Sequence, residues 1–192
     1  MSEIKVNKVS PATGTAIQLG DSGDTFTVPS GATIVNSGTA TGFGGGKMLQ
    51  ILQTVKTDTA TTTSGTFSTV LSVTITPSAT SSKVFVLYHF QGYGGNAGSS
   101  IKLLRDSTDI YVGDASGSRI QGSGNFKYAN NEDIENLSGH YLDSPSSTSA
   151  IVYALQWRSN GGTNYMNRSD ADANTADATR VPSSITVIEI GA

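Results

Sequence analysis

Residues 47–192 contain short runs in which apolar and polar side chains alternate. The clearest places Ile151, Tyr153, Leu155 and Trp157 on one face. A period of two residues is that of a β-strand with one buried face. Clusters of Gly, Asn, Asp and Ser separate these runs, as in an antiparallel sandwich or barrel. The predicted strands are Met48–Val55, Phe67–Thr76, Lys83–Gln91, Ser100–Arg105, Asp109–Val112, Asn125–Tyr128, Leu137–Leu142, Ala150–Arg158, Asn164–Asn167 and Ser184–Ile190.

The run Lys83–Gln91 is apolar on both of its faces. Its alternate positions form two sets, Val84/Val86/Tyr88/Phe90 and Phe85/Leu87/His89. One face fits a sandwich core, and the other needs either a covering loop or a neighbouring subunit. The pattern leaves both interpretations open.

Local turn and helix signals complete the pattern of this region. The sequence Asn160-Gly161-Gly162 predicts a tight hairpin turn between the strands on either side of it. No ten-residue segment has a helical period, and Asn131–Leu137 could form one short helical turn at most.

Residues 1–46 have a different pattern, with very short apolar alternations interrupted every few residues by Gly, Asp, Ser or Pro. Burying about six large side chains would contribute roughly 9–18 kcal/mol. Ordering the backbone costs about 1–2 kcal/mol for each residue. The segment is therefore expected to be disordered or held by other chains. The GFGGG sequence at 42–46 predicts a flexible joint, which divides the chain into segments 1–46 and 47–192.

The amino-acid composition disfavours several structural and functional classes. The chain has 192 residues, 26 Ser, 24 Thr and only 14% charged residues, which disfavours long helices. It has no Cys, which excludes disulfides and cysteine-ligated metals. A net charge of −3 disfavours nucleic acid as a partner. No apolar run approaches the ~18 residues of a membrane span, and the first ten residues predict no secretory signal.

Candidate catalytic and metal motifs fail in their details. Gly42–Met48 is one residue short of a phosphate loop, and Gly92–Ala97 precedes a strand pattern instead of the helix of a dinucleotide site. Asp170–Asp177 begins like a calcium loop but lacks its Gly and Glu, so only weak cation binding stays open. The only histidines, His89 and His140, fall within strand patterns. We therefore expect no catalytic residue, metal or cofactor.

Loop residues with aromatic, amide and acidic side chains give one binding signal, because such groups suit polar ligands such as sugars. They are equally typical of plain turns. The candidate contact residues are Tyr93, Asn96, Tyr128, Asn130, Asn131, Asp170, Asp172 and Asn174.

Several longer phrases carry a resemblance to a known family. The N-terminal phrase GDTFTVPSGATIVNSGTATGFG resembles the leader of tail fibres and related appendage proteins of marine bacteriophages, including cyanophages. The phrases VTITPSATSSKVFV, IKLLRDSTDI, YLDSPSSTSAIVYALQW and SSITVIEI resemble the β-sandwich head of the same proteins. Such heads are similar to trimeric jelly rolls of the C1q/TNF kind.

The resemblance implies an all-β homotrimer, with a short β-rich stem followed by an antiparallel jelly-roll head. The stem would dock on another virion protein, and the head loops would bind a host-surface glycan or protein without catalysis. The chain would thus be located in the virion. A capsid-decorating fibre is the alternative, and a glycan-cleaving appendage is a minor one. Three copies of the stem would share a core of Ile4, Val6, Ile17, Leu19, Phe26, Val28, Ile34 and Val35.

Overall fold

The computed structural model describes residues 9–33, 35, 47–127 and 130–191. The chain divides into two units, Met1–Phe43 and Gly44–Ala192. In the described part of the first unit the backbone forms turns at residues 21–24 and 29–32, but no strand. Its predicted strands therefore do not form within one chain over this part. Ile4, Val6, Ile34 and the predicted joint at 42–46 lie outside the described residues.

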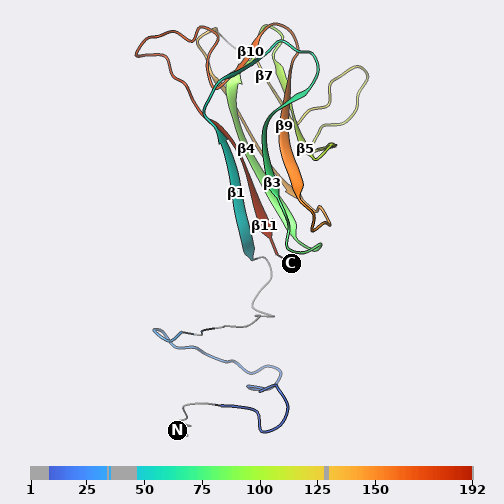
Figure 1. Ribbon diagram of the computed structural model, residues 1–192, viewed down its shortest axis with the longest axis vertical. Helices are drawn as coiled ribbons and strands as arrows, with labels where there is room; N and C mark the ends of the chain where they lie inside the picture. The colour runs from blue at the N-terminus through green and yellow to red at the C-terminus, as the bar shows by residue number, and fades with distance from the viewer. Residues whose placement is uncertain (1–8, 34, 36–46, 128–129, 192) are drawn as a thin grey trace. The chain divides into compact units, whose positions relative to one another are not determined.

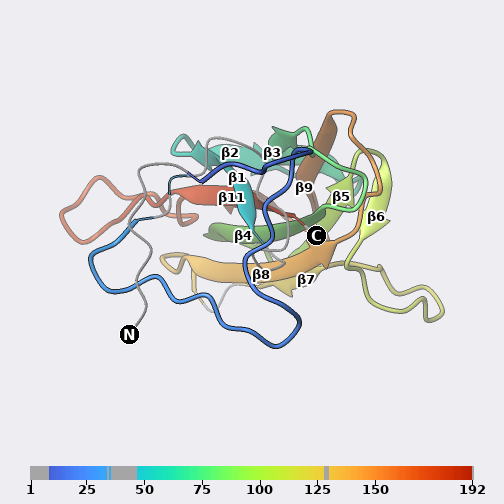
Figure 2. The same ribbon diagram turned by 90° about the horizontal axis from the view of Figure 1, so that it is seen from below.

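The second unit is a sandwich of two antiparallel sheets, which Figure 1 shows from the side and Figure 2 from below. The six-stranded sheet has the order β1 (Met48–Lys56), β11 (Ser183–Ile190), β4 (Lys83–Tyr93), β10 (Asn164–Met166) and β2 (Ala60–Thr62), with β8 (Glu135–Asp143) also paired to β4. The five-stranded sheet has the order β3 (Ser68–Ile75), β9 (Ile151–Ser159), β5 (Ser99–Arg105) and β6 (Thr108–Ile110), with β7 (Gly124–Phe126) paired to β5. The all-β antiparallel prediction is confirmed.

The core lies between the sheets and comes from the faces that alternation predicted. Ile151, Tyr153, Leu155 and Trp157 of β9 are each at most 3% exposed. The aromatic ring of Phe90 from the opposite sheet lies 5.8 Å from that of Trp157, centre to centre. Strand β4 has one face in this core, while Leu87 on its other face is 36% exposed. No loop of the described chain therefore covers the outer face of β4 completely.

Two carboxylates are buried at the end of the sandwich where β1 begins. Glu189 accepts hydrogen bonds from the backbone and hydroxyl of Ser78, both at 2.7 Å, and from Gln50 at 2.6 Å. Burial acts to raise the pKa of Glu189, but these hydrogen bonds outweigh it and lower the pKa to about 2. Asp143 accepts hydrogen bonds from Tyr153 and Arg105. Each buried charge is thus compensated.

The predicted hairpin at Asn160–Gly162 is wrong. The segment joins β9 of the five-stranded sheet to β10 of the six-stranded sheet, so its two flanking strands do not pair. The side chains of Asn164 and Met166, both 0% exposed, fix β10 beside β4. Among the described residues, no helix is long and apolar enough to cross a membrane.

The sandwich has two distinct ends. At one, β1 begins at Met48 and β11 ends at Ile190, and these two residues are paired. At the other, β4 ends at Tyr93 and β10 pairs with it. We call the second the loop end, because the loops at 94–98, 130–134, 160–163 and 167–182 gather there (Figure 1, top).

Candidate functional site

The loop end carries every candidate contact residue that the structure describes. Tyr93 is the last residue of β4 and Asn96 lies in the β4–β5 connection, whereas the others come from the segments before β8 and after β10. Tyr128 lies outside the described residues. The candidates do not form one cluster, however, and they divide into a pocket, an ion-pair network and a turn.

Two glycine-rich loops meet at close range to form the wall of the pocket. The Gly98 carbonyl accepts a hydrogen bond from the Asn160 backbone at 3.0 Å. The Asn164 side chain, which is fully buried, accepts one from the Gly95 backbone at 2.7 Å. A Cβ atom on Gly95 would lie 2.7 Å from the Thr163 carbonyl oxygen, so only glycine fits there. The wall is therefore held by backbone contacts and by the Asn164 side chain.

The pocket itself has a volume of about 140 Å³, and we call it the tyrosine pocket. It brings together three of the candidate residues, Tyr93, Asn96 and Asp170, which are far apart in the sequence. Tyr165 faces Tyr93 across the β4–β10 pairing, with 6.0 Å between ring centres. The full lining is Tyr93, Gly95, Asn96, Gly162, Thr163, Tyr165 and Asp170.

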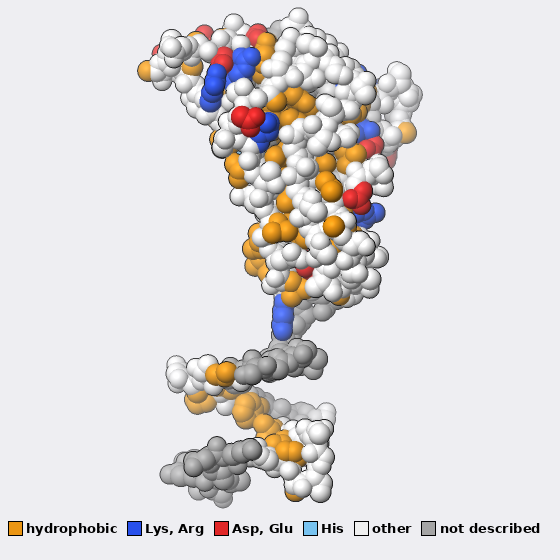
Figure 3. Space-filling model, viewed as in Figure 1, with side chains coloured by type: hydrophobic (Ala, Val, Ile, Leu, Met, Phe, Trp, Pro, Cys, Tyr) orange, Lys and Arg blue, Asp and Glu red, His pale blue; other side chains and the backbone are white. Residues whose placement is uncertain are grey.

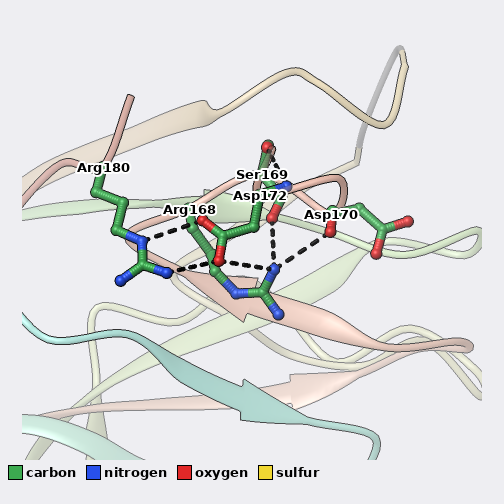
Figure 4. Close-up of polar contacts among 5 residues, drawn as sticks. All are labelled: Arg168, Ser169, Asp170, Asp172 and Arg180. Atoms are coloured by element: carbon green, nitrogen blue, oxygen red, sulfur yellow. Dashed lines mark hydrogen bonds and ion pairs between the residues drawn. The ribbon is translucent and has the colours of Figure 1, made fainter. Parts of the chain in front are cut away.

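An ion-pair network supports the pocket from the loop after β10 (Figure 4). The Asp172 carboxylate accepts two hydrogen bonds from Arg180, at 2.7 and 3.1 Å, and lies 3.7 Å from Arg168. The Arg180 hydrogen bond lowers the pKa of Asp172. Arg168 also lies 3.8 Å from the centre of the Tyr165 ring. The Asp172 carboxylate is thus paired with two arginines, and its link to the pocket is Arg168, which packs on the Tyr165 ring.

The Asp170 carboxylate behaves differently from that of Asp172. It points away from both guanidinium groups in Figure 4, and it makes no hydrogen bond or ion pair with any described residue. The Asp170 backbone carbonyl, by contrast, accepts a hydrogen bond from the Arg168 guanidinium at 3.2 Å. The side chain of Asp170 is exposed and available to a ligand.

The remaining candidates lie outside the tyrosine pocket. Asn130 forms a turn, since its side chain bonds Asp133 at 3.0 Å and accepts from the Glu132 backbone at 2.7 Å. The Asn131 carbonyl accepts from the Ala171 backbone and so joins two loops. Asn174 is exposed beside Asp172. The hydrogen bonds of Asn130 are those of a turn.

Sequence reasoning missed Tyr165, Thr163 and Arg168. Tyr165 and Thr163 lie in or next to a predicted strand, where an aromatic or hydroxyl side chain carries no separate binding signal. Arg168 has no motif at all. The one available signal was the Asn160-Gly161-Gly162 sequence, which ends two residues before Asn164 and marks a close approach of two backbones.

The outer face of the six-stranded sheet is a second candidate surface. Ile51, Ile188, Phe85 and Leu142 stand opposite one another on four adjacent strands, and we call them the apolar row. Ile51 is 56% exposed and Leu142 is 47% exposed. In Figure 3 apolar side chains gather on the surface around β1.

The histidines lie on this same outer face. His89 and Ser138 share a hydrogen bond of 2.9 Å, and Ser138 also bonds Asn136. In the described chain no carboxylate hydrogen-bonds either imidazole, so the arrangement lacks the acid of a catalytic triad. No group of three or more His, Cys, Asp or Glu that could hold a metal lies within the described ranges.

In the first unit, large apolar side chains are exposed. The described residues that were predicted for the stem core are 37–83% exposed in the single chain. They are Ile17, Leu19, Phe26, Val28 and Val35.

Comparison with known proteins gives no family: no protein-family model matches the chain, and no curated protein matches it.

Proposed function

We propose that the chain is a homotrimeric, non-catalytic attachment protein of a bacteriophage particle. Its N-terminal segment docks on another virion protein, and its loop end binds the host cell surface. The observation that carries this proposal is the polarity of the sandwich. The chain enters β1 at one end, and the tyrosine pocket lies at the opposite end. An attachment protein needs this separation of anchor and contact surface.

The strand arrangement supports a jelly-roll head. Successive long strands alternate between the layers, with β1, β4, β8 and β11 in one sheet and β3, β5 and β9 in the other. Two facing antiparallel sheets linked in this way are the layout of a jelly roll. This layout agrees with the head that the resemblance implies.

Exposed apolar surface supports self-association. The apolar row crosses four strands, yet the outer face at these strands carries few charges. Side chains such as Phe26 and Val35 in the first unit are also exposed. Such surfaces are typical of faces buried against another molecule. A second and third copy of the chain would cover both surfaces at once, and closed symmetry would keep the assembly finite.

A labelling experiment tests the proposal. Antibodies against residues 47–192 would be applied to intact phage particles and located by electron microscopy. We expect label on the tail, together with reduced phage adsorption when host cells are first incubated with the purified protein. Label on the capsid would favour the decorating fibre, and unlabelled particles would refute a virion location. Release of reducing ends from host polysaccharide would refute the non-catalytic assignment.

A further inference from the structure

We propose that the tyrosine pocket binds one terminal sugar residue of a neutral surface glycan. This inference rests on the proposed attachment function and specifies its ligand. It assigns the contact to Thr163, Tyr165 and Asp170, and the other lining residues, Tyr93 and Asn96 among them, support these three.

The lining has the mixed chemistry that a sugar requires. A pyranose presents C–H groups on its faces and hydroxyls around its edge. The half-buried Tyr165 supplies aromatic surface for one face, while Tyr93 beside it is only 5% exposed and supports the Tyr165 ring. The Asp170 carboxylate can accept hydrogen bonds from two hydroxyls, and Thr163 adds a hydroxyl group. A purely apolar ligand would cover the Asp170 carboxylate without giving it a hydrogen bond.

The pocket is held in shape before any ligand binds. Its wall is fixed by the backbone contacts of Gly95 with the 160–163 loop and by the buried Asn164 side chain. Arg168 packs on the Tyr165 ring and also bonds the Asp170 carbonyl, so it holds two of the lining residues in place. A preorganised site loses little entropy on binding, which favours affinity for a small ligand.

The charge around the pocket favours a neutral ligand over a sulfated or uronic acid-containing one. The two nearby arginines, Arg168 and Arg180, both pair with Asp172. The Asp170 carboxylate has no such partner in the described chain, so the unpaired charge facing a ligand is negative. An anionic sugar would be repelled by Asp170, whereas hydroxyl groups would be attracted to it.

The size of the pocket limits the contact to one residue of the glycan. A volume of about 140 Å³ holds roughly four or five water molecules. It is smaller than the ~300–1,000 Å³ typical of sites that enclose a drug-sized ligand. One sugar ring can enter it, but a chain of several cannot. Binding by one pocket would be weak, and three linked copies would strengthen it through avidity.

The test uses the full-length protein and an array of immobilised neutral, sulfated and uronic acid-containing oligosaccharides. Any neutral sugar bound on the array would then be titrated as its soluble methyl glycoside. The variants are Asp170→Asn and Tyr165→Ala, and Asp177→Asn is the matched control. Asp177 is an exposed carboxylate of the same loop and lines a neighbouring hollow, not the tyrosine pocket.

We expect neutral sugars to bind. Asp170→Asn should lower the affinity for the soluble glycoside at least tenfold, and Asp177→Asn should leave this affinity unchanged. Because Tyr165→Ala could disturb β10, the melting temperature of this variant is measured, and Asp170→Asn, at an exposed position, is the deciding variant. Binding only to anionic sugars, binding to no neutral sugar, or unchanged affinity in Asp170→Asn would each overturn this inference. In any of these cases, retained binding to host cells would leave the attachment function standing, whereas loss of cell binding by the wild-type protein would refute that function itself.

Discussion

Glu189 provides a direct test of the energetics of the sandwich. Its carboxylate is completely buried and accepts three hydrogen bonds, at 2.6–2.7 Å, from Gln50 and Ser78. We expect Glu189→Gln to destabilise the head. An amide in the same place keeps one acceptor oxygen but turns its NH₂ group toward the Gln50 amide, which already donates to the Thr76 carbonyl. The loss of charge-assisted hydrogen bonds costs about 1.5–3 kcal/mol.

The pH dependence follows from the lowered pKa of Glu189. In the unfolded chain this carboxyl titrates at about 4.5, and in the folded protein at about 2. Because the folded value is the lower one, the stabilisation is fully present above pH 4.5 and is lost as the pH falls toward 2. A difference of this size corresponds to about 3 kcal/mol, at 1.36 kcal/mol per pKa unit.

The assay is urea unfolding of the full-length protein at one fixed concentration between pH 7 and pH 2. The wild-type protein should lose stability below pH 4.5 more steeply than Glu189→Gln, and the two curves should converge at low pH. Glu132→Gln is the matched control, because Glu132 is exposed, and it should follow the wild-type curve. Parallel curves for wild type and Glu189→Gln would contradict the account of this buried carboxylate.

Three further predictions concern the surfaces and loops. Leu142→Asp places a charge in the apolar row and should weaken self-association at least 100-fold in sedimentation, whereas Ile120→Asp, at a similar exposure of 43%, should not. Gly95→Ala should destabilise the head by about 1–3 kcal/mol in thermal unfolding, because its Cβ would lie 2.7 Å from the Thr163 carbonyl oxygen. Gly113→Ala is the control and should be close to neutral, because its nearest contact is at 4.0 Å. Arg180→Ala removes the partner of the Asp172 carboxylate and should speed amide hydrogen exchange in that loop but not in β9; unchanged exchange would show that the ion pair does not order the loop.

The sequence predicted much of the fold because sheet faces are encoded by a period of two. Each strand predicted in residues 47–192 overlaps an observed one, and the buried face of β9 was identified residue by residue. The three-residue strand β2 was missed, because its Thr-rich sequence has no apolar alternation. The Asn160–Gly162 hairpin was predicted wrongly, because turn chemistry is local. Membership of a sheet is decided instead by distant packing, here that of Met166 against the core.

The candidate site could be predicted only in part for the same reason. Residue types identified Tyr93, Asn96 and Asp170, but the sequence contains no signal that a pocket would join them. Asp172 looked equally available, and only the structure shows its carboxylate paired with Arg180. The sequence gives the chemical type of each side chain directly, whereas the contacts between side chains depend on how loops distant in the sequence pack together.

The mass of the full-length protein in solution tests the proposed assembly most directly. One chain has a mass of 19.8 kDa. If three copies cover the apolar row and the exposed side chains of the N-terminal segment, native mass spectrometry and light scattering should both give about 59 kDa, three times the mass of one chain. A stable species of one chain at micromolar concentration would contradict the homotrimer, and with it the multivalent attachment that we propose.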